Sequence, residues 1–281
     1  MTTKLILIEG IPGSGKSTIA QKTGEYLSAR GIKTKVYTEG QLHPVDLAWC
    51  AYIPFAHFES IMSLYPQYGE TLRGKMRIEN KHVIIAYTQS GIKDPDFCRL
   101  LESYEVFSGR TGFNVFTELF LKRWGNFAKK EENSDEISVF ECAYLQNQLC
   151  ELIYFYQMDE SNIEKYMLSL MDTVKNINPI MFYLNQPDIA EHLRCLADER
   201  VNENGEKDWL RQVILYTENS PYGQMHNLKG FEGVIKGLEK RKQIELNLIK
   251  KLPLKTYIIE NPDYNWDEVW QQIQEKLAVI Y

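Results

Sequence analysis

The stretch that decides the fold is residues 5–18, LILIEGIPGSGKST. It opens with four apolar residues, 5–8, a run of strand length that is typical of a strand covered on both faces. The pattern G-x-x-x-x-G-K-[ST] follows and is satisfied in full by Gly10, Gly15, Lys16 and Ser17. Glycines in such a loop let successive backbone N–H groups turn inward around phosphate oxygens. The stretch therefore predicts a phosphate-binding loop (P-loop) between a strand and a helix.

The residues of this loop have expected roles in holding a nucleotide. The phosphates are expected to lie against the loop and the first helical turn, in contact with Gly13, Ser14, Gly15, Lys16, Ser17 and Thr18. Lys16 is expected to reach the outer phosphates, where the helix that begins near it adds the positive end of its dipole. The Ser17 hydroxyl is expected to bind Mg²⁺. ATP and Mg²⁺ are therefore the expected cofactors.

Beyond this loop, strands and helices alternate over much of the chain. Four further segments have the length and apolar character of strands: residues 33–38, 137–140, 180–184 and 255–259. A strand–helix–strand opening connects parallel strands through a right-handed crossover. The sequence therefore predicts an α/β protein with a P-loop NTPase fold, in which helices flank a five-stranded parallel sheet within a single domain, residues 1–281.

The alternation stops between residues 43 and 135. Prolines, aromatic residues and short helical stretches replace it, and Asp94 followed by Pro95 is typical of the start of a helix. Five aromatic residues recur at helical spacing and predict the buried face of one helix: Phe113, Phe116, Phe120, Trp124 and Phe127. We therefore expect a helical insertion, residues 43–135, between the second and third strands. Residues 194–230, which contain a polar stretch at 202–207, are expected to form a lid.

Composition excludes several classes of protein. The chain has 38 acidic against 32 basic residues, a net charge of −6, which argues against a nucleic-acid partner because phosphate neutralisation needs a basic face. No stretch approaches the ~20 apolar residues that cross a bilayer, so no membrane partner is expected. The five cysteines form no C-x-x-C pair, which favours reduced thiols in the cytoplasm over disulfides or zinc. The expected partner is a small-molecule phosphoryl acceptor, and a homodimer stays an open option.

Two acidic residues are expected at the ends of strands, where ligands of open α/β sheets bind. Glu39 follows the second strand and Glu141 follows the third. Phosphoryl transfer needs one acid that organises Mg²⁺ and another that accepts a proton from the attacking hydroxyl. We expect Glu141 on the metal side and Glu39 on the substrate side, with the opposite assignment left open. Glu9, at the end of the first strand, is expected to be structural.

Transfer of a phosphoryl group also needs cations over the migrating group. Arg194 and Arg200 flank the polar stretch of the expected lid, a position that suits closure over ATP. In the insertion, which would cover the acceptor, the candidates for substrate contact are Arg110, Arg123 and His43. The alternative for each arginine is a solvated helix charge, and for His43 a hydrogen-bonded turn residue.

The opening stretch resembles the start of the P-loop nucleoside and nucleotide kinases, especially the deoxynucleoside kinase and thymidylate kinase group. In that group a Glu after the second strand is followed by Pro and Trp, an order that Glu39, Pro44 and Trp49 repeat with wider spacing. The resemblance implies that Glu39 is the base or a substrate ligand. It also implies that Glu141 lies near Mg²⁺. The group normally has arginine after the latter acid, where this chain has Cys142, so that arginine's role does not carry over.

The resemblance extends to the later strands and covers roughly half the chain. Residues 178–184 and the helix that reaches Arg194 and Arg200 resemble the fourth strand and the lid helix of these kinases. Residues 260–263, which end at Asp263, fall where the group holds adenine. Residues 43–135 are not covered, so the identity of the acceptor does not transfer. The whole chain also resembles bacterial P-loop NTPases for which no reaction is implied.

Two functions follow from these features. The first is an ATP- and Mg²⁺-dependent phosphotransferase, a kinase that acts on a small hydroxylated or phosphorylated metabolite such as a nucleoside or nucleotide. The second is a nucleotide-gated regulatory NTPase or binding protein with no acceptor. A kinase requires an enclosed polar cavity that joins Glu39, His43 and the insertion to the P-loop. A regulatory protein would present an exposed apolar face beside mobile loops.

Overall fold

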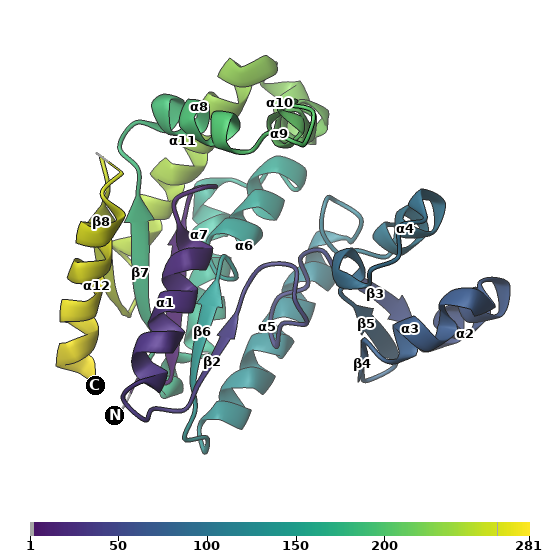
Figure 1. Cartoon of the computed structure of the whole chain (residues 1–281), viewed down its shortest axis with the longest axis horizontal. Coiled ribbons are helices and arrows are strands. Elements are labelled where there is room, and N and C mark those ends of the chain that lie inside the picture. Colours follow the sequence, from purple (N-terminus) through teal and green to yellow (C-terminus); the bar gives the residue numbers. More distant parts are fainter. Residues whose placement is uncertain (1–2, 263) are drawn as a thin grey trace.

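The computed structural model describes residues 3–262 and 264–281. Its centre is a five-stranded sheet in the order β2-β6-β1-β7-β8 (Figure 1). The strands are β1 (Leu5–Gly10), β2 (Thr34–Tyr37), β6 (Ile137–Glu141), β7 (Ile180–Asn185) and β8 (Lys255–Glu260). All four neighbouring pairs are parallel. The predicted α/β fold and its five-stranded parallel sheet are confirmed.

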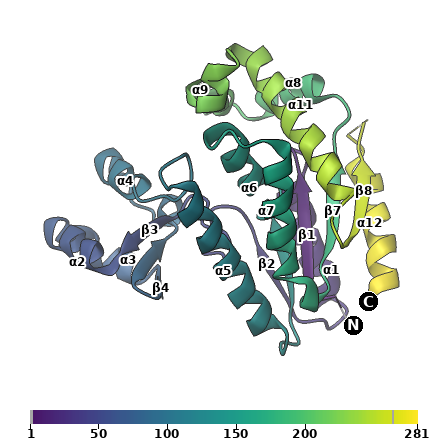
Figure 2. The same cartoon turned by 180° about the vertical axis from the view of Figure 1, so that it is seen from behind.

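Helices cover both faces of this sheet, as Figures 1 and 2 show from opposite sides. On one face, Ile6 and Ile8 of β1 share an apolar core with α1 (Lys16–Ser28) and α12 (Trp266–Ile280). On the other face, Leu5 and Leu7 share a core with α5, α7 and α11. These helices are α5 (Phe113–Glu131), α7 (Glu160–Asp172) and α11 (Gly230–Ile249). Alternate residues of a strand point to opposite faces, which explains why the continuous apolar run of β1 is buried on both sides.

Residues 43–112 of the insertion form a lobe beside the end of β2 and beside α5, the last helix of the insertion, which packs against the sheet (Figure 1). Its helices are α2 (Phe55–Leu64), α3 (Gly69–Arg73) and α4 (Pro95–Glu102), and the Asp94 side chain caps α4 as predicted. The lobe also contains a three-stranded antiparallel sheet of β3 (Ala51–Pro54), β5 (His82–Ile85) and β4 (Met76–Glu79). The expectation of a helical insertion is therefore corrected, because this part of the chain contains strands as well as helices. These strands are four residues long, too short to show a clear alternation in the sequence.

Helices lie across the carboxyl ends of the parallel strands, at the top of Figure 1. They are α8 (Ile189–Glu199), α9 (Asp208–Asn219), α10 (Pro221–Met225) and the first part of α11. A short helix, α6 (Gln146–Cys150), continues into the π-helical turn η3 (Glu151–Phe155). The remaining turns are η1 (Pro66–Tyr68), η2 (Tyr87–Gln89) and η4 (Lys175–Ile177). None of the described helices has the length and apolar character to cross a membrane.

Candidate nucleotide-binding site

The P-loop joins β1 to α1, as the motif requires. Gly13 and Gly15 have φ angles of 77° and 81°, in the left-handed region that glycine adopts without strain. A Cβ atom at Gly13 would collide with the side chain of Leu196, and one at Gly15 would collide with Trp266. The loop is therefore held between α8 and α12. Both its backbone conformation and its neighbours require glycine at these positions.

Two side chains of the loop point to its use for an anion. Lys16 is 5% exposed, and its Nζ donates to the carbonyl of Ile11 at 2.7 Å, so the lysine folds back across the loop. Ser14 is fully buried, and its hydroxyl has no hydrogen-bond partner. Buried polar groups in proteins are nearly always paired. Phosphate oxygens in the loop would offer acceptors to both side chains. Thr18, in the first turn of α1, is exposed.

Ser17, in the first turn of α1, and Glu141, at the carboxyl end of β6, lie in contact with each other. The Ser17 hydroxyl donates to Oε1 of Glu141 at 2.5 Å, and Oε2 of Glu141 accepts from the backbone N–H of Glu39 at 3.2 Å. Hydroxyl and carboxylate oxygens are ligands that suit Mg²⁺, which retains several waters and binds substrate phosphates. The described residues hold no group of three or more His, Cys, Asp or Glu side chains for a metal. A site with one carboxylate and one hydroxyl therefore fits Mg²⁺ better than a metal with an all-protein ligand set.

Glu39 lies beside this pair, just beyond the end of β2. Burial raises the pKa of its carboxyl, while the charge of Lys16 acts in the opposite direction. The charge of Glu141 also raises this pKa, and a hydrogen bond from Trp49 lowers it. A carboxylate with a raised pKa is a better proton acceptor. Lys16, Glu39 and Glu141 come from three segments that are distant in sequence. The structure brings them together at the carboxyl ends of the parallel strands.

Glu9, at the end of β1, holds the backbone of the segment that follows β6. Its buried carboxylate accepts the backbone N–H groups of Tyr144 at 2.7 Å and Gln146 at 3.1 Å. Burial raises the pKa of this carboxyl to about 7, against those two hydrogen bonds. These contacts hold the segment that follows β6, which contains Cys142 with a φ of 63°. They are structural contacts, as expected for Glu9.

The predicted lid arginines lie against aromatic rings. The Arg194 guanidinium is 5.7 Å from the centre of the Phe231 ring and pairs with Glu191 at 3.5 Å. The Arg200 guanidinium lies 5.0 Å from the ring of Trp209. Arg194 is more than half exposed in this arrangement. Closure of these two arginines over ATP stays a prediction.

His192 of α8 makes a contact with the P-loop that the sequence analysis missed. Its Nε2 lies 2.8 Å from the Pro12 carbonyl oxygen, and its ring stacks on Tyr264 with centroids 5.9 Å apart. Burial lowers the pKa of this histidine. Its spacing of four residues from Leu196, which also contacts the loop, was the only available signal. The segment expected to hold adenine ends at Asp263, which lies outside the described residues.

His43, a predicted acceptor-side residue, is buried in the turn after β2. Its Nδ1 accepts the N–H groups of Val45 at 3.1 Å and Asp46 at 3.0 Å. Burial holds its pKa well below the usual range, and two nearby arginines act in the same direction. Asp46 in turn accepts from Asn147 of α6 at 2.8 Å, which ties the insertion to the segment after β6. The neutral imidazole therefore organises this turn.

Arg123 of α5, a second predicted acceptor-side residue, anchors the same turn. Its Nε donates to the carbonyl of Val45 at 3.1 Å, and Nη2 donates to those of His43 at 3.1 Å and Pro44 at 3.2 Å. Its Nη1 donates to Glu79 of β4 at 2.6 Å. The side chain is 1% exposed. The structure gives this arginine protein partners in place of the expected substrate contact.

Arg110, the third candidate in the insertion, pairs with Glu102 at 2.7 Å and with Glu105 at 3.0 Å. Glu105 also accepts from the Tyr87 hydroxyl at 2.6 Å. These contacts lie within the insertion. The structure pairs Arg110 with two acids of the insertion, and its contact with a substrate stays a prediction.

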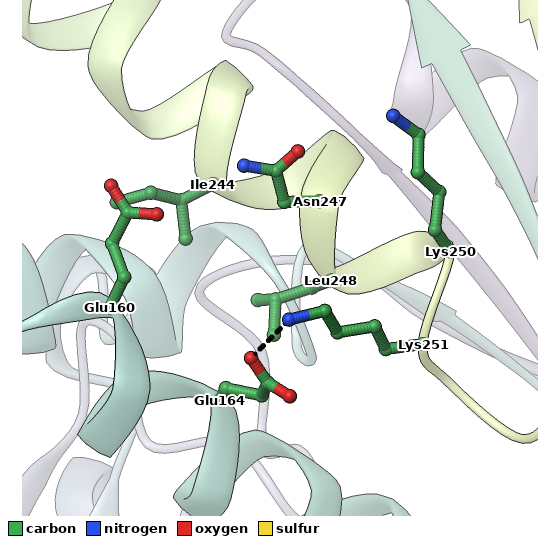
Figure 3. A pocket seen from close by; sticks show the side chains of 7 residues that line it. All are labelled: Glu160, Glu164, Ile244, Asn247, Leu248, Lys250 and Lys251. Carbon is green, nitrogen blue, oxygen red and sulfur yellow. Dashed lines mark hydrogen bonds and ion pairs between the residues drawn. The ribbon is translucent and has the colours of Figure 1, made fainter.

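A surface pocket of about 250 Å³ lies between α7 and α11 (Figure 3). Seven residues line it: Glu160, Glu164, Ile244, Asn247, Leu248, Lys250 and Lys251. The Lys251 Nζ pairs with Glu164 at 2.6 Å across it. None of the predicted site residues belongs to this lining. We therefore place the site at the P-loop and the carboxyl ends of β2 and β6.

Comparisons with known proteins find similar chains among solved structures alone. No protein-family model and no curated protein matches the chain. The solved structures to which it is similar include thymidylate kinase from Ehrlichia chaffeensis, with 15% identity, a TM-score of 0.42 and coverage of 99% of this chain and 100% of that one. Thymidylate kinase from Candida albicans has 13% identity and a TM-score of 0.42, with coverage of 99% and 92%. Deoxyadenosine kinase from M. mycoides has 14% identity and a TM-score of 0.43, with coverage of 98% and 99%.

Proposed function

We propose that the chain is an ATP- and Mg²⁺-dependent phosphotransferase that acts on a small acceptor with a hydroxyl group. The observation that carries this proposal is the double contact of Glu141, which accepts from the Ser17 hydroxyl and from the backbone of Glu39. It ties the phosphate-binding loop to an acid with a raised pKa that can take a proton. A binding protein without an acceptor has no need of that second acid.

The residues divide the chemistry as follows. The loop N–H groups and Lys16 bind the triphosphate and neutralise its outer charge. Mg²⁺, held by Ser17 and Glu141, would supply further charge neutralisation at the phosphates. The acceptor oxygen forms a bond to the γ-phosphorus while the bond to the β–γ bridging oxygen breaks, and ADP leaves. The hydroxyl proton passes to the Glu39 carboxylate.

The insertion and the lid enclose this reaction. Residues 43–135 would cover the acceptor, and residues 194–230 would cover ATP. Arg194 and Arg200 would turn from their aromatic partners toward the phosphates when the lid closes. Exclusion of water from the closed site would favour transfer to the acceptor over hydrolysis.

A regulatory NTPase is the second candidate, because large apolar side chains of the insertion are exposed. They are Trp49 at 51%, Phe55 at 42%, Leu64 at 76% and Ile78 at 55%. Exposed apolar residues of this size are common at partner surfaces. In that case the protein would hydrolyse ATP slowly and transfer its phosphoryl group to water alone.

A screen of ADP formation from MgATP separates the two functions. The acceptors tested are nucleosides, nucleotides, sugars and aminoglycosides, each compared with the rate of ATP hydrolysis without acceptor. A phosphotransferase shows a higher rate with one chemical class and forms its phosphate ester in equal amount to ADP. A rate that no acceptor raises would contradict the proposal and support the regulatory NTPase.

A further inference from the structure

One side chain of α8 donates a hydrogen bond to the backbone of the P-loop. His192 is 2% exposed, and its Nε2 lies 2.8 Å from the carbonyl oxygen of Pro12. A carbonyl oxygen only accepts, so Nε2 carries a proton and donates it to this bond. The second ring nitrogen, Nδ1, is buried and has no hydrogen-bond partner among the described residues. Burial lowers the pKa of His192, which makes Nδ1 the unprotonated nitrogen of a neutral ring.

The imidazole ring and the helix that carries it are held in place. The ring stacks on Tyr264, with an angle of 11° between the two planes. Tyr264 has a φ of 54°, a conformation that bulky residues rarely adopt and that persists only where the surroundings hold it. Leu196, one turn after His192 on α8, packs against Gly13, where a Cβ atom would lie 2.4 Å from its side chain. The helix α8 therefore contacts the P-loop at two consecutive residues, Pro12 and Gly13.

The bond from His192 fixes the direction of one peptide group. The peptide between Pro12 and Gly13 is trans, so the carbonyl of Pro12 and the N–H of Gly13 point in opposite directions within one plane. His192 holds the carbonyl toward α8, and the N–H of Gly13 consequently points away from α8. None of the described residues accepts a hydrogen bond from this N–H. Such an N–H is available to a phosphate oxygen in the loop.

This peptide depends on the histidine more than its neighbour does. The carbonyl of Ile11 is held by Nζ of Lys16, which belongs to the loop, at 2.7 Å. In the described part of the chain, His192 is the one donor to the carbonyl of Pro12. Proline leaves its ψ angle free and glycine lacks a Cβ, so the peptide between them is free to turn once this bond is lost. A turned peptide would present a carbonyl oxygen, with its partial negative charge, to the phosphates.

We propose that His192 is a positioning residue of the nucleotide site, whose bond to the Pro12 carbonyl directs the N–H of Gly13 at a phosphate oxygen of ATP. The proposal deepens the phosphotransferase function above and rests on its nucleotide binding. His192 contacts neither ATP nor the acceptor and acts through one peptide group of the loop. The bond at the carbonyl end of this peptide also strengthens the bond that its N–H donates, because both polarise the same group.

This peptide can be observed alone, because Pro12–Gly13 is the only Pro-Gly pair in the sequence. Protein labelled with ¹³C at the proline carbonyl and with ¹⁵N in glycine gives one signal in an NMR experiment that correlates a carbonyl carbon with the amide that follows it. The probe is the magnesium complex of the non-hydrolysable β,γ-imido analogue of ATP. We expect the Gly13 amide proton to move to lower field on binding, because it donates to an anionic oxygen. An unmoved proton in protein that binds the analogue by calorimetry would overturn the inference.

Three substitutions separate the hydrogen bond of His192 from its packing. His192→Gln keeps an N–H donor near the position of Nε2, His192→Asn has an amide that is too short to reach the carbonyl, and His192→Leu has no donor. We expect the Kd of the magnesium complex to rise about tenfold in the Asn and Leu variants, and less than about threefold in the Gln variant. The movement of the Gly13 proton should be reduced in the same two variants and restored by Gln.

A purely structural role of His192 gives a different pattern. It would lower the unfolding temperature of the Asn and Leu variants and leave the Kd and the Gly13 signal of the folded protein unchanged, which would overturn the inference. Thermal unfolding establishes that each variant is folded, and His57→Leu, at an exposed residue of α2, is the control that should keep the wild-type Kd. Equal Kd values in all variants would overturn the role of His192 and leave the phosphotransferase function intact. A wild-type protein that does not bind the complex would overturn both.

Discussion

The P-loop, residues 10–18, and the insertion, residues 43–135, follow the carboxyl ends of β1 and β2, but their polar side chains have different partners. In the P-loop, Lys16 folds onto its own backbone and the Ser14 hydroxyl is unpaired, so both are free for a ligand. In the insertion, Arg123 and His43 are already bonded to backbone groups of the turn after β2. The P-loop leaves polar groups available to a ligand, whereas the insertion pairs these side chains within the protein. A charged residue near a site is therefore a binding candidate only when its existing partners leave a group unused.

The largest effect is expected at the P-loop. Lys16→Ala should lower ATP turnover by about 10³-fold or more, roughly 4 kcal/mol of transition-state stabilisation, because the outer phosphates lose their cation. The thermal unfolding temperature should change little, since Lys16 bonds only to a loop carbonyl. ADP formation and thermal unfolding check the two expectations. Near-normal turnover in the variant would show that Lys16 does not bind the phosphates, and the P-loop would then differ little from the insertion.

A large effect on stability is expected in the insertion. Arg123→Met leaves three backbone carbonyls and Glu79 without their buried partner, which should lower the free energy of unfolding by about 3 kcal/mol. Binding of MgATP should be retained at temperatures where the variant is folded. The control is Arg99→Met, whose ion pair is exposed and should contribute less than about 1 kcal/mol. Denaturant unfolding measures both. Equal stability for the two variants would show that Arg123 is free to serve a substrate.

A smaller effect is expected at the junction of the two regions. Glu39→Gln removes the proposed proton acceptor and should lower kcat with the acceptor by about 10²-fold, roughly 2.7 kcal/mol. The affinity for MgATP should stay the same, because the ATP contacts lie in the P-loop and at Glu141. Steady-state kinetics and calorimetric titration separate the two quantities. A loss of ATP affinity with unchanged kcat would move Glu39 to the metal side.

The smallest effect concerns the pH dependence of stability. Burial raises the pKa of Glu9 from 4.5 to about 7, so the folded state holds this proton more tightly than the unfolded state. The resulting stabilisation is present below pH 4.5 and is lost as the pH rises through 7. Glu9→Gln should remove about 2 kcal/mol of that decline. Denaturant unfolding of both proteins across this pH range checks it, and parallel curves would contradict a buried, protonated Glu9.

The sequence predicted the sheet and the P-loop because physical constraints there act on neighbouring residues. Residues 5–8 are all apolar because their strand is buried on both faces. The glycines that follow are those of the phosphate-binding motif, so both signals lie within one short stretch of sequence. The sheet of the insertion was missed because β4, Met76–Glu79, is short and half exposed, so its side chains do not alternate clearly. Whether so short a segment forms a strand depends on the strand with which it pairs, here β5.

Four residues of the candidate site, Lys16, Ser17, Glu39 and Glu141, were chosen from the sequence because they lie at strand ends or in the motif, and their roles stay predictions. The contact of His192 with the P-loop could not be chosen in this way. In the sequence His192 is one residue of an amphipathic helix, and its ring reaches the Pro12 carbonyl only because α8 packs against a loop 180 residues earlier in the chain.

Calorimetric titration with MgATP tests the central claim most directly, because phosphotransfer here depends on the P-loop. The account predicts saturable binding at one site with a Kd below about 1 mM for the folded protein, and loss of that binding in Lys16→Ala. Absence of binding heat at several temperatures, in protein that circular dichroism shows to be folded, would contradict it. Equal binding by the wild type and Lys16→Ala would place the nucleotide elsewhere.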